Sequence, residues 1–237
     1  MSLEGQRVVI IGGTSGIGRA VAQAALAAGA SVHIGSSNAD KLKAALALLG
    51  TGATGATIDV CDEGSVEAFF ADAQPIDHLV YTAGDWVRRK TQVGVKFDLA
   101  ASQESVQTRF WGVLLTIKYA LPVMSQTGSI TLTSGLYAHR PVKGTSLITA
   151  FNGAVEHLAR GLAVDLAPIR VNTVTAGFID TEAWEAMSDE MKQGVTTKQV
   201  ISRPGLPEEV AEAYLYFMRA GYTTGQVSVV DGGGLFA

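Results

Sequence analysis

A glycine-rich turn is the first group of residues whose types and spacing suggest chemistry. Gly12-Gly13-Thr14-Ser15-Gly16-Ile17-Gly18 follows a short apolar run and opens into an alanine-rich stretch. Glycines let the backbone turn sharply and approach a ligand closely, and free N–H groups at the start of a helix bind anions. Between a strand and a helix, this turn predicts a dinucleotide site; the alternative is a purely structural turn. The residues expected to contact the cofactor here are Gly12, Thr14, Ser15, Gly16 and Ile17.

The residues after the second expected strand bear on which dinucleotide would bind. An NAD site usually places an acid here, which accepts a hydrogen bond from the adenosine ribose. This chain has Gly35-Ser36-Ser37-Asn38, and no carboxylate precedes Asp40. The side chains of Ser36, Ser37 and Asn38 can donate to a 2′-phosphate, and Arg19 could assist them. The sequence therefore predicts NADP in preference to NAD.

The elements that must position these residues alternate along the chain. We expect strands at 8–11, 31–35, 54–60, 76–83, 129–133, 170–175 and 227–230. Helices are expected at 15–28, 39–48, 62–73, 100–121, 145–166 and 207–220, with Asp62 as an N-cap and Pro207 in a first turn. Such alternation requires right-handed crossovers and a parallel sheet. The expected fold is α/β: a single doubly wound, Rossmann-type sheet of about seven strands with helices on both faces, forming one domain over residues 1–237. The long segment 178–203 is expected to be a substrate lid.

Composition narrows the class of protein. The 237 residues carry a formal net charge of −4, which argues against a nucleic-acid partner. The single cysteine excludes an intramolecular disulfide and a cysteine-based zinc site, and no metal site is expected. Neither a signal peptide nor a membrane span is evident. We therefore expect a soluble cytoplasmic protein that acts on a small molecule.

Several motifs together resemble the short-chain dehydrogenase/reductase family. They are the Gly-x3-Gly-x-Gly turn, Ala83-Gly84, Ile169-Arg170-Val171-Asn172, Ala176–Thr181, and Thr224-Gly225-Gln226 with Asp231-Gly232-Gly233. The chain departs from the family pattern at Ile11, where Thr is usual, and at Ala176, where Pro is usual. The resemblance implies a homodimer or homotetramer and further cofactor contacts. Those contacts are Asp59 at the adenine ring, and Val60, Ala83, Gly84, Gly177, Ile179 and Thr181.

The resemblance also shows where the catalytic pattern departs. Enzymes of this family use a Ser to orient the substrate oxygen, a Tyr to exchange its proton, a Lys four residues later, and a helical Asn. Ser134 matches the Ser, but Ile148 and Asn152 occupy the Tyr and Lys positions, and Arg109 occupies the Asn position. Ile148 cannot transfer a proton, whereas Asn152 can still bond ribose hydroxyls of the cofactor.

A replacement for the missing acid is expected near Ser134. Tyr137 and His139 follow it directly, in the loop off a central strand, and water is the third alternative. Pocket-lining residues are expected at Arg109, at Trp184 and Met187 on the lid, and at Asp85, Trp86 and Arg88.

Two functions fit these observations. The first is an NADP-dependent oxidoreductase that acts on a small carbonyl or alcohol substrate with an altered proton-transfer site. The alternative is a catalytically weak or inactive NADP(H)-binding regulatory protein, which the Ile148 and Asn152 substitutions motivate.

Overall fold

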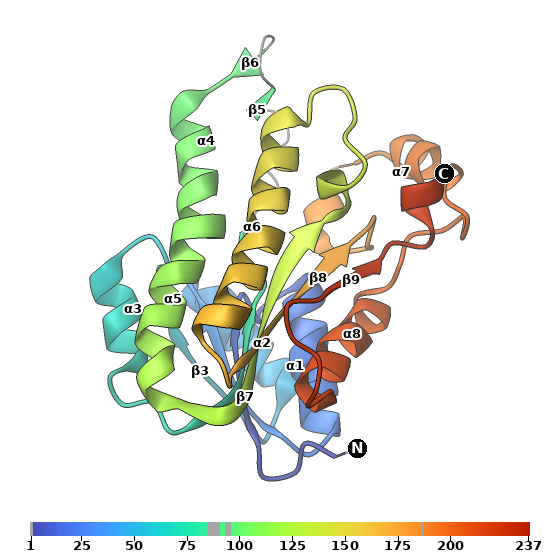
Figure 1. Ribbon diagram of the computed structural model, residues 1–237. Helices are drawn as coiled ribbons and strands as arrows, with labels where there is room; N and C mark the ends of the chain where they lie inside the picture. The colour runs from blue at the N-terminus through green and yellow to red at the C-terminus, as the bar shows by residue number, and fades with distance from the viewer. Residues whose placement is uncertain (1, 85–90, 93–95, 186) are drawn as a thin grey trace.

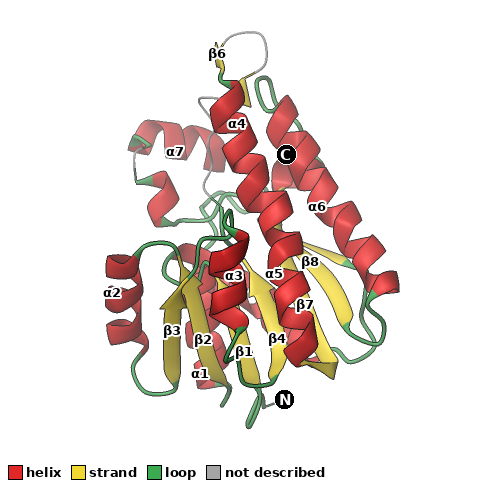
Figure 2. Cartoon of the chain, turned by 90° about the vertical axis from the view of Figure 1, so that its left-hand side faces the viewer, coloured by secondary structure: helices red, strands yellow, loops and turns green. Residues whose placement is uncertain are grey.

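Seven parallel strands form the centre of the molecule. The computed structural model describes residues 2–84, 91–92, 96–185 and 187–237. The strand order is β3-β2-β1-β4-β7-β8-β9, and every pairing is parallel (Figures 1 and 2). This confirms the predicted Rossmann-type sheet. Its strands are β1 (Arg7–Ile11), β2 (Ser31–Ser36), β3 (Ala53–Thr57), β4 (Ile76–Tyr81), β7 (Met124–Gly135), β8 (Arg170–Ala176) and β9 (Val227–Val230).

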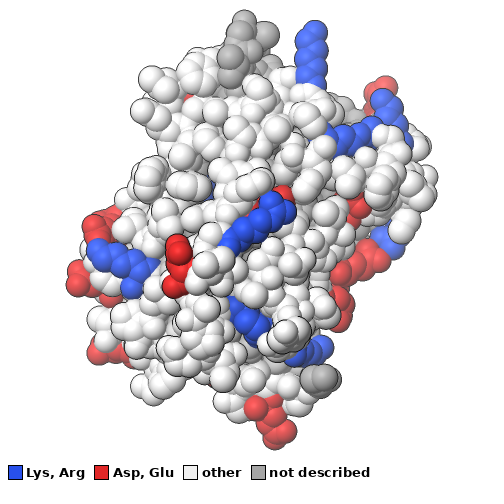
Figure 3. Space-filling view, in the orientation of Figure 1, with Lys and Arg blue, Asp and Glu red and all other residues white. Residues whose placement is uncertain are grey.

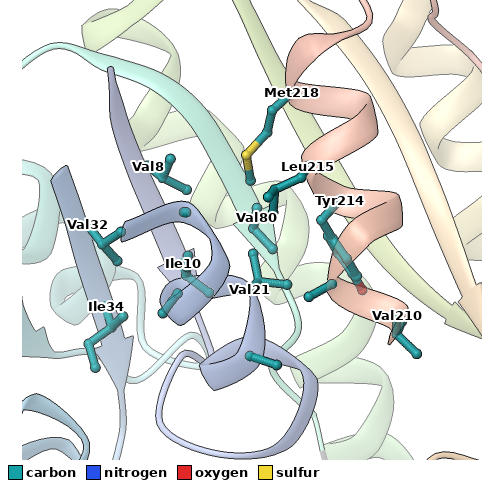
Figure 4. Packing of buried hydrophobic residues seen from close by; sticks show 14 of the residues in the cluster. Val8, Ile10, Val21, Val32, Ile34, Val80, Val210, Tyr214, Leu215 and Met218 are labelled. Atoms are coloured by element: carbon teal, nitrogen blue, oxygen red, sulfur yellow. The ribbon is translucent and has the colours of Figure 1, made fainter. Parts of the chain in front are cut away.

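Helices cover both faces of this sheet, and an apolar core lies on each side. Val21 of α1, Leu42 of α2 and Tyr214 of α8 pack on one face. Figure 4 shows Val21 and Tyr214 with the strand residues Val8 and Ile10 in this core. On the other face, side chains of α3, α5 and α6 form a second core. The helices are α1 (Gly16–Ala27), α2 (Ala39–Leu49), α3 (Glu63–Phe70), α4 (Leu99–Val106), α5 (Gly112–Ala120), α6 (Ser146–Asp165), α7 (Asp189–Thr196) and α8 (Pro207–Arg219).

Side-chain caps and a buried arginine fix several helix ends. Asp62 caps α3 by accepting from the Gly64 N–H at 3.1 Å, and Pro207 begins α8, both as predicted. Arg170, buried at the start of β8, donates to the carbonyl oxygens of Phe217, Met218 and Ala220 at the end of α8. This last arrangement ties the final turn of a helix to the sheet.

The structure differs from the predicted elements in several places. The predicted helix over 100–121 is interrupted by a π-helical turn at Gln107–Trp111, which separates α4 from α5. The third strand ends at Thr57 and not at residue 60. The segment 178–203 contains α7, whose N-cap Ser188 accepts from the Met191 N–H at 3.3 Å. A short antiparallel pair, β5 (Thr91–Gln92) and β6 (Lys96–Phe97), also lies outside the main sheet.

The surface shows no extended field of one charge on the face in Figure 3, where Lys and Arg side chains are interspersed with Asp and Glu. In the part of the chain that the structure describes, no helix combines the length and apolar character needed to cross a bilayer.

A buried histidine gives the fold a pH dependence. His78 of β4 is 2% exposed; its Nδ1 lies 2.8 Å from Ser129 Oγ and its Nε2 lies 3.1 Å from Gln6 Oε1. Burial lowers the pKa of His78 to about 4, although the charge of Asp77 opposes the shift. The unfolded chain therefore binds more protons than the folded one between pH 6.5 and about 4.

We expect the free energy of unfolding to fall by up to about 3 kcal/mol as the pH drops from 6.5 to 4, because His78 must stay neutral to remain buried. Urea denaturation at a series of pH values measures this. The pH slope in that window should flatten in His78→Gln but persist in His157→Gln, since His157 is exposed. Parallel profiles for wild type and His78→Gln would contradict the assignment.

Candidate functional site

A cleft of about 710 Å³ opens at the carboxyl ends of β1, β4, β7 and β8. This edge of a doubly wound sheet is where ligands bind, and the volume lies within the range of small-molecule sites. The sequence-predicted glycine turn forms one wall. Its lining residues include Gly12, Thr14, Ser15, Gly16 and Ile17.

The glycine turn packs so closely against β4 that side chains are excluded. Gly12 has a φ of +93°, and a Cβ there would lie 2.7 Å from the Ala83 backbone nitrogen. A Cβ on Gly18 would collide with the Gly12 carbonyl oxygen. Thr82 Oγ1 lies 3.2 Å from the carbonyl oxygens of both Ile11 and Gly12, so its hydroxyl anchors the turn to the end of β4. The turn is therefore a rigid, backbone-lined surface.

The end of the cleft beside β2 is lined by polar residues and by a lysine. Its lining includes Ser36, Ser37, Asn38 and Asp59, whose contacts with the adenosine half of a dinucleotide stay a prediction. Asn38 caps α2, with its Oδ1 accepting from the Lys41 N–H at 2.8 Å. The Lys41 side chain also lines the cleft, and sequence reasoning missed it. Its place in the first turn of α2, directly after the serine pair, was the available signal.

At the loop's helical end, a carboxylate from a distant segment contacts the backbone. Glu182, in the 3₁₀ turn Glu182–Trp184 after β8, accepts from the Gly16 N–H at 2.9 Å. Its other oxygen lies 2.7 Å from Arg19 Nη2. Burial raises the pKa of this carboxyl, but hydrogen bonds from its own backbone N–H and that of Gly16, together with the Arg19 charge, lower it overall. Glu182 is therefore ionised. No local sequence pattern predicts this contact, because its partners are far apart along the chain.

The predicted cofactor residues further along the cleft come from two strand ends. Ala83 and Gly84 follow β4, and Gly177, Ile179 and Thr181 follow β8; all line the cleft. Val60 does not, and its side chain is buried beneath Gly112 of α5.

Ser134, at the end of β7, lines the cleft but is engaged in a buried polar cluster. Its Oγ lies 3.1 Å from both the Asn152 carbonyl oxygen and Glu156 Oε1. Glu156, 2% exposed on α6, also accepts from Thr175 Oγ1 at 2.6 Å and lies 3.0 Å from His139 Nε2. A buried carboxylate needs such partners. We call Ser134, His139, Glu156 and Thr175 the Glu156 cluster.

Arg109 enters the cleft from the π-helical turn. Its Nη2 donates to the Gly84 carbonyl oxygen at 2.7 Å, and the residue lines the cleft. A π-helical turn inserts one extra residue in a helix and is frequent at functional sites. Trp184 also lines the cleft, and its ring lies 4.7 Å from that of Phe178. The predicted pocket residues Asp85, Trp86 and Arg88 lie outside the described residues.

Comparisons with known proteins agree with this geometry. A family model described as enoyl-(acyl carrier protein) reductase matches residues 12–234. A short-chain dehydrogenase/reductase of Stachybotrys chlorohalonatus is 35% identical over 250 residues, covering 98% of each chain. The chain belongs to the short-chain dehydrogenase/reductase family.

Two solved structures of the family extend the comparison. The MalC reductase/Diels-Alderase of Malbranchea aurantiaca superposes with a TM-score of 0.91 at 36% identity, covering 99% of this chain and 97% of that one. A small-chain dehydrogenase in complex with NADPH superposes with a TM-score of 0.84 at 32% identity, covering 98% and 99%.

Two of the predicted departures from the short-chain dehydrogenase/reductase pattern, Ile148 and Asn152, fall on buried side chains. Ile148 is 9% exposed and Asn152 is 2% exposed, and neither lines the cleft. Asn152 Nδ2 lies 3.3 Å from the Gly135 carbonyl oxygen, so its amide is used by the backbone. Its contact with a cofactor ribose stays a prediction. Tyr137 and His139 also lie outside the cleft lining, although His139 reaches Ser134 through Glu156.

Loss of the Glu156 carboxylate is expected to destabilise the fold, because the buried Thr175 hydroxyl would lose its acceptor and the contacts of Ser134 and His139 with Glu156 would also be lost. We expect Glu156→Ala to lower the free energy of unfolding by about 3 kcal/mol, as measured by urea denaturation. Glu212→Ala, which removes an exposed carboxylate from α8, should change it by less than about 0.5 kcal/mol. Equal effects of the two substitutions would contradict a structural role for the cluster.

Proposed function

We propose that the protein is an NADP-dependent oxidoreductase that acts on a small carbonyl or alcohol substrate. The observation that carries the proposal is the cleft itself. The glycine turn lines it, with Thr14 Oγ1 3.5 Å from Ser36 Oγ. Ser36, Ser37 and Lys41 line it as well, and β2 carries no carboxylate. The contact of an ionised Glu182 with the Gly16 N–H fits this, because it shows that the turn accommodates an anion. The NADPH complex of a related dehydrogenase supports the same cofactor.

The residues present fit this dinucleotide along its length. The glycine turn would hold the diphosphate, and Asp59 would lie at the adenine ring. Ser36, Ser37 and Lys41 would hold the 2′-phosphate, with Lys41 supplying the positive charge that the serines lack. When bound, NADPH supplies the hydride.

Proton handling would pass through the Glu156 cluster in place of the missing Tyr and Lys. Ser134 Oγ would orient the substrate oxygen and give it a proton. Glu156 Oε1, 3.1 Å from Ser134 Oγ, would return a proton to Ser134 and take one from His139 Nε2. His139, which is exposed, would regain its proton from water. Among the three proton sources that the sequence left open, the contact between His139 and Glu156 supports His139.

The alternative function is an NADP(H)-binding regulatory protein with little or no turnover. It is favoured by one observation: the buried Ile148 and Asn152 leave the side of the cleft along α6 without the usual acid and cation.

Replacement of Lys41 tests the cofactor preference. We expect Lys41→Ala to weaken NADPH binding by about tenfold and to leave NADH binding unchanged, because only NADPH carries the 2′-phosphate. Calorimetric titration of both nucleotides measures this. Lys43→Ala is the matched control, since Lys43 is exposed on α2 outside the cleft lining. Tighter binding of NADH than of NADPH by the wild type would contradict the NADP preference.

Turnover separates the two functions. We expect the wild type to oxidise NADPH with members of a carbonyl panel, and Ser134→Ala to lower kcat/KM by about 100-fold. Ser129→Ala is the control, because Ser129 lies on the same strand but bonds His78 away from the cleft. NADPH binding with no oxidation across the panel would favour the regulatory function, and an unchanged rate in Ser134→Ala would remove Ser134 from the mechanism.

A further inference from the structure

The contact between Glu182 and the glycine turn has a consequence for binding. Two donors, the Gly16 N–H and the Arg19 guanidinium, converge on one carboxylate that belongs to a segment 166 residues away in sequence. Building on the proposed function, we propose that Glu182 occupies the place of diphosphate oxygens, that the dinucleotide expels it, and that Arg19 then binds the diphosphate.

The two donors have the chemistry that a diphosphate requires. Backbone N–H groups at the start of α1 and a guanidinium are the groups that bind phosphate oxygens in proteins, and a carboxylate is the nearest side-chain equivalent of such an oxygen pair. Glu182 and Arg19 both lie beside the cleft, and Glu182 is part of its lining. The Glu182 carboxylate and a diphosphate cannot both bind here at the same time, because the Gly16 N–H can donate to only one of them in this geometry.

The contact is also weak enough to be replaced. The side chains of Arg19 and Glu182 are 32% and 40% exposed, and a solvent-exposed ion pair contributes little to stability. A diphosphate carries more charge than one carboxylate and can engage several N–H groups of the turn at once. Arg19 therefore exchanges one anionic partner for another and is not left unpaired.

Displacement of Glu182 would free the backbone from Thr181 to Trp184, as well as the Glu182 side chain, from its contacts with the glycine turn. Thr181, the preceding residue, is seated on the turn, since a Cβ on Gly16 would lie 3.1 Å from Thr181 Cγ2. Trp184 follows in the same 3₁₀ turn and lines the cleft. Glu182 thus sets the dinucleotide affinity and links its binding to the position of the residues after β8.

Binding of NADPH and of inorganic diphosphate to the full-length protein tests the proposal. We expect Glu182→Ala to bind both ligands about fivefold more tightly than the wild type, because the competing anion is gone. Glu185→Ala is the matched control: it removes an exposed carboxylate three residues away and changes the net charge equally. Arg19→Ala should bind both ligands more weakly than the wild type. Thermal denaturation of each variant verifies that it is folded.

The outcomes are distinct. A gain in Glu182→Ala that is absent in Glu185→Ala, with a loss in Arg19→Ala, supports the proposal. Equal gains in the two glutamate variants would indicate a general charge effect and overturn it, as would unchanged or weaker binding in Glu182→Ala. Unchanged or tighter binding in Arg19→Ala would show that Arg19 only holds Glu182, and would overturn its role at the diphosphate. Wild-type protein that binds no dinucleotide would overturn the proposed function together with this inference, whereas NADPH binding that ignores Glu182 overturns the inference alone.

Discussion

The close approach of the glycine turn to the end of β4 is the constraint on which the site depends. Gly12 and Gly18 have no room for a Cβ, and the Thr82 hydroxyl anchors the turn to its neighbouring strand. The start of α1 is thereby held at a fixed place at the carboxyl edge of the sheet. Much of the remaining lining of the cleft comes from strand ends that this same sheet aligns, so the positions of Ser36, Ala83, Ser134 and Gly177 follow from the pairing of their strands.

The sequence was sufficient for the features that local patterns encode. Apolar runs alternating with helical stretches predicted the parallel sheet, and the Gly-x3-Gly-x-Gly spacing predicted the turn that lines the cleft. The capping role of Asp62 was predicted for the same reason, since the cap and its partner Gly64 lie two residues apart.

The features that escaped prediction depend on pairs distant in sequence. Glu182 meets Gly16, and Glu156 meets Thr175 and His139, only after the sheet has formed. The π-helical turn was missed for another reason: the composition of Gln107–Trp111 is compatible with an ordinary α-helix, and periodicity does not reveal one inserted residue. The roles expected for Val60 and Asn152 at the cofactor stay predictions; in the structure the Val60 side chain is buried and the Asn152 amide lies 3.3 Å from the Gly135 carbonyl oxygen.

The π-helical turn at Gln107–Trp111 divides one long helix into α4 and α5, and it rotates the side chains of one relative to those of the other about the helix axis. Each residue of an α-helix advances the side-chain direction by about 100°, so a single inserted residue rotates α4 relative to α5 by a similar amount. This lets α5 keep Val113 and Ile117 in the core while Arg109 faces the cleft. Because of the inserted residue, the part of the helix that faces the cleft can be oriented without rotating the part that packs on the sheet.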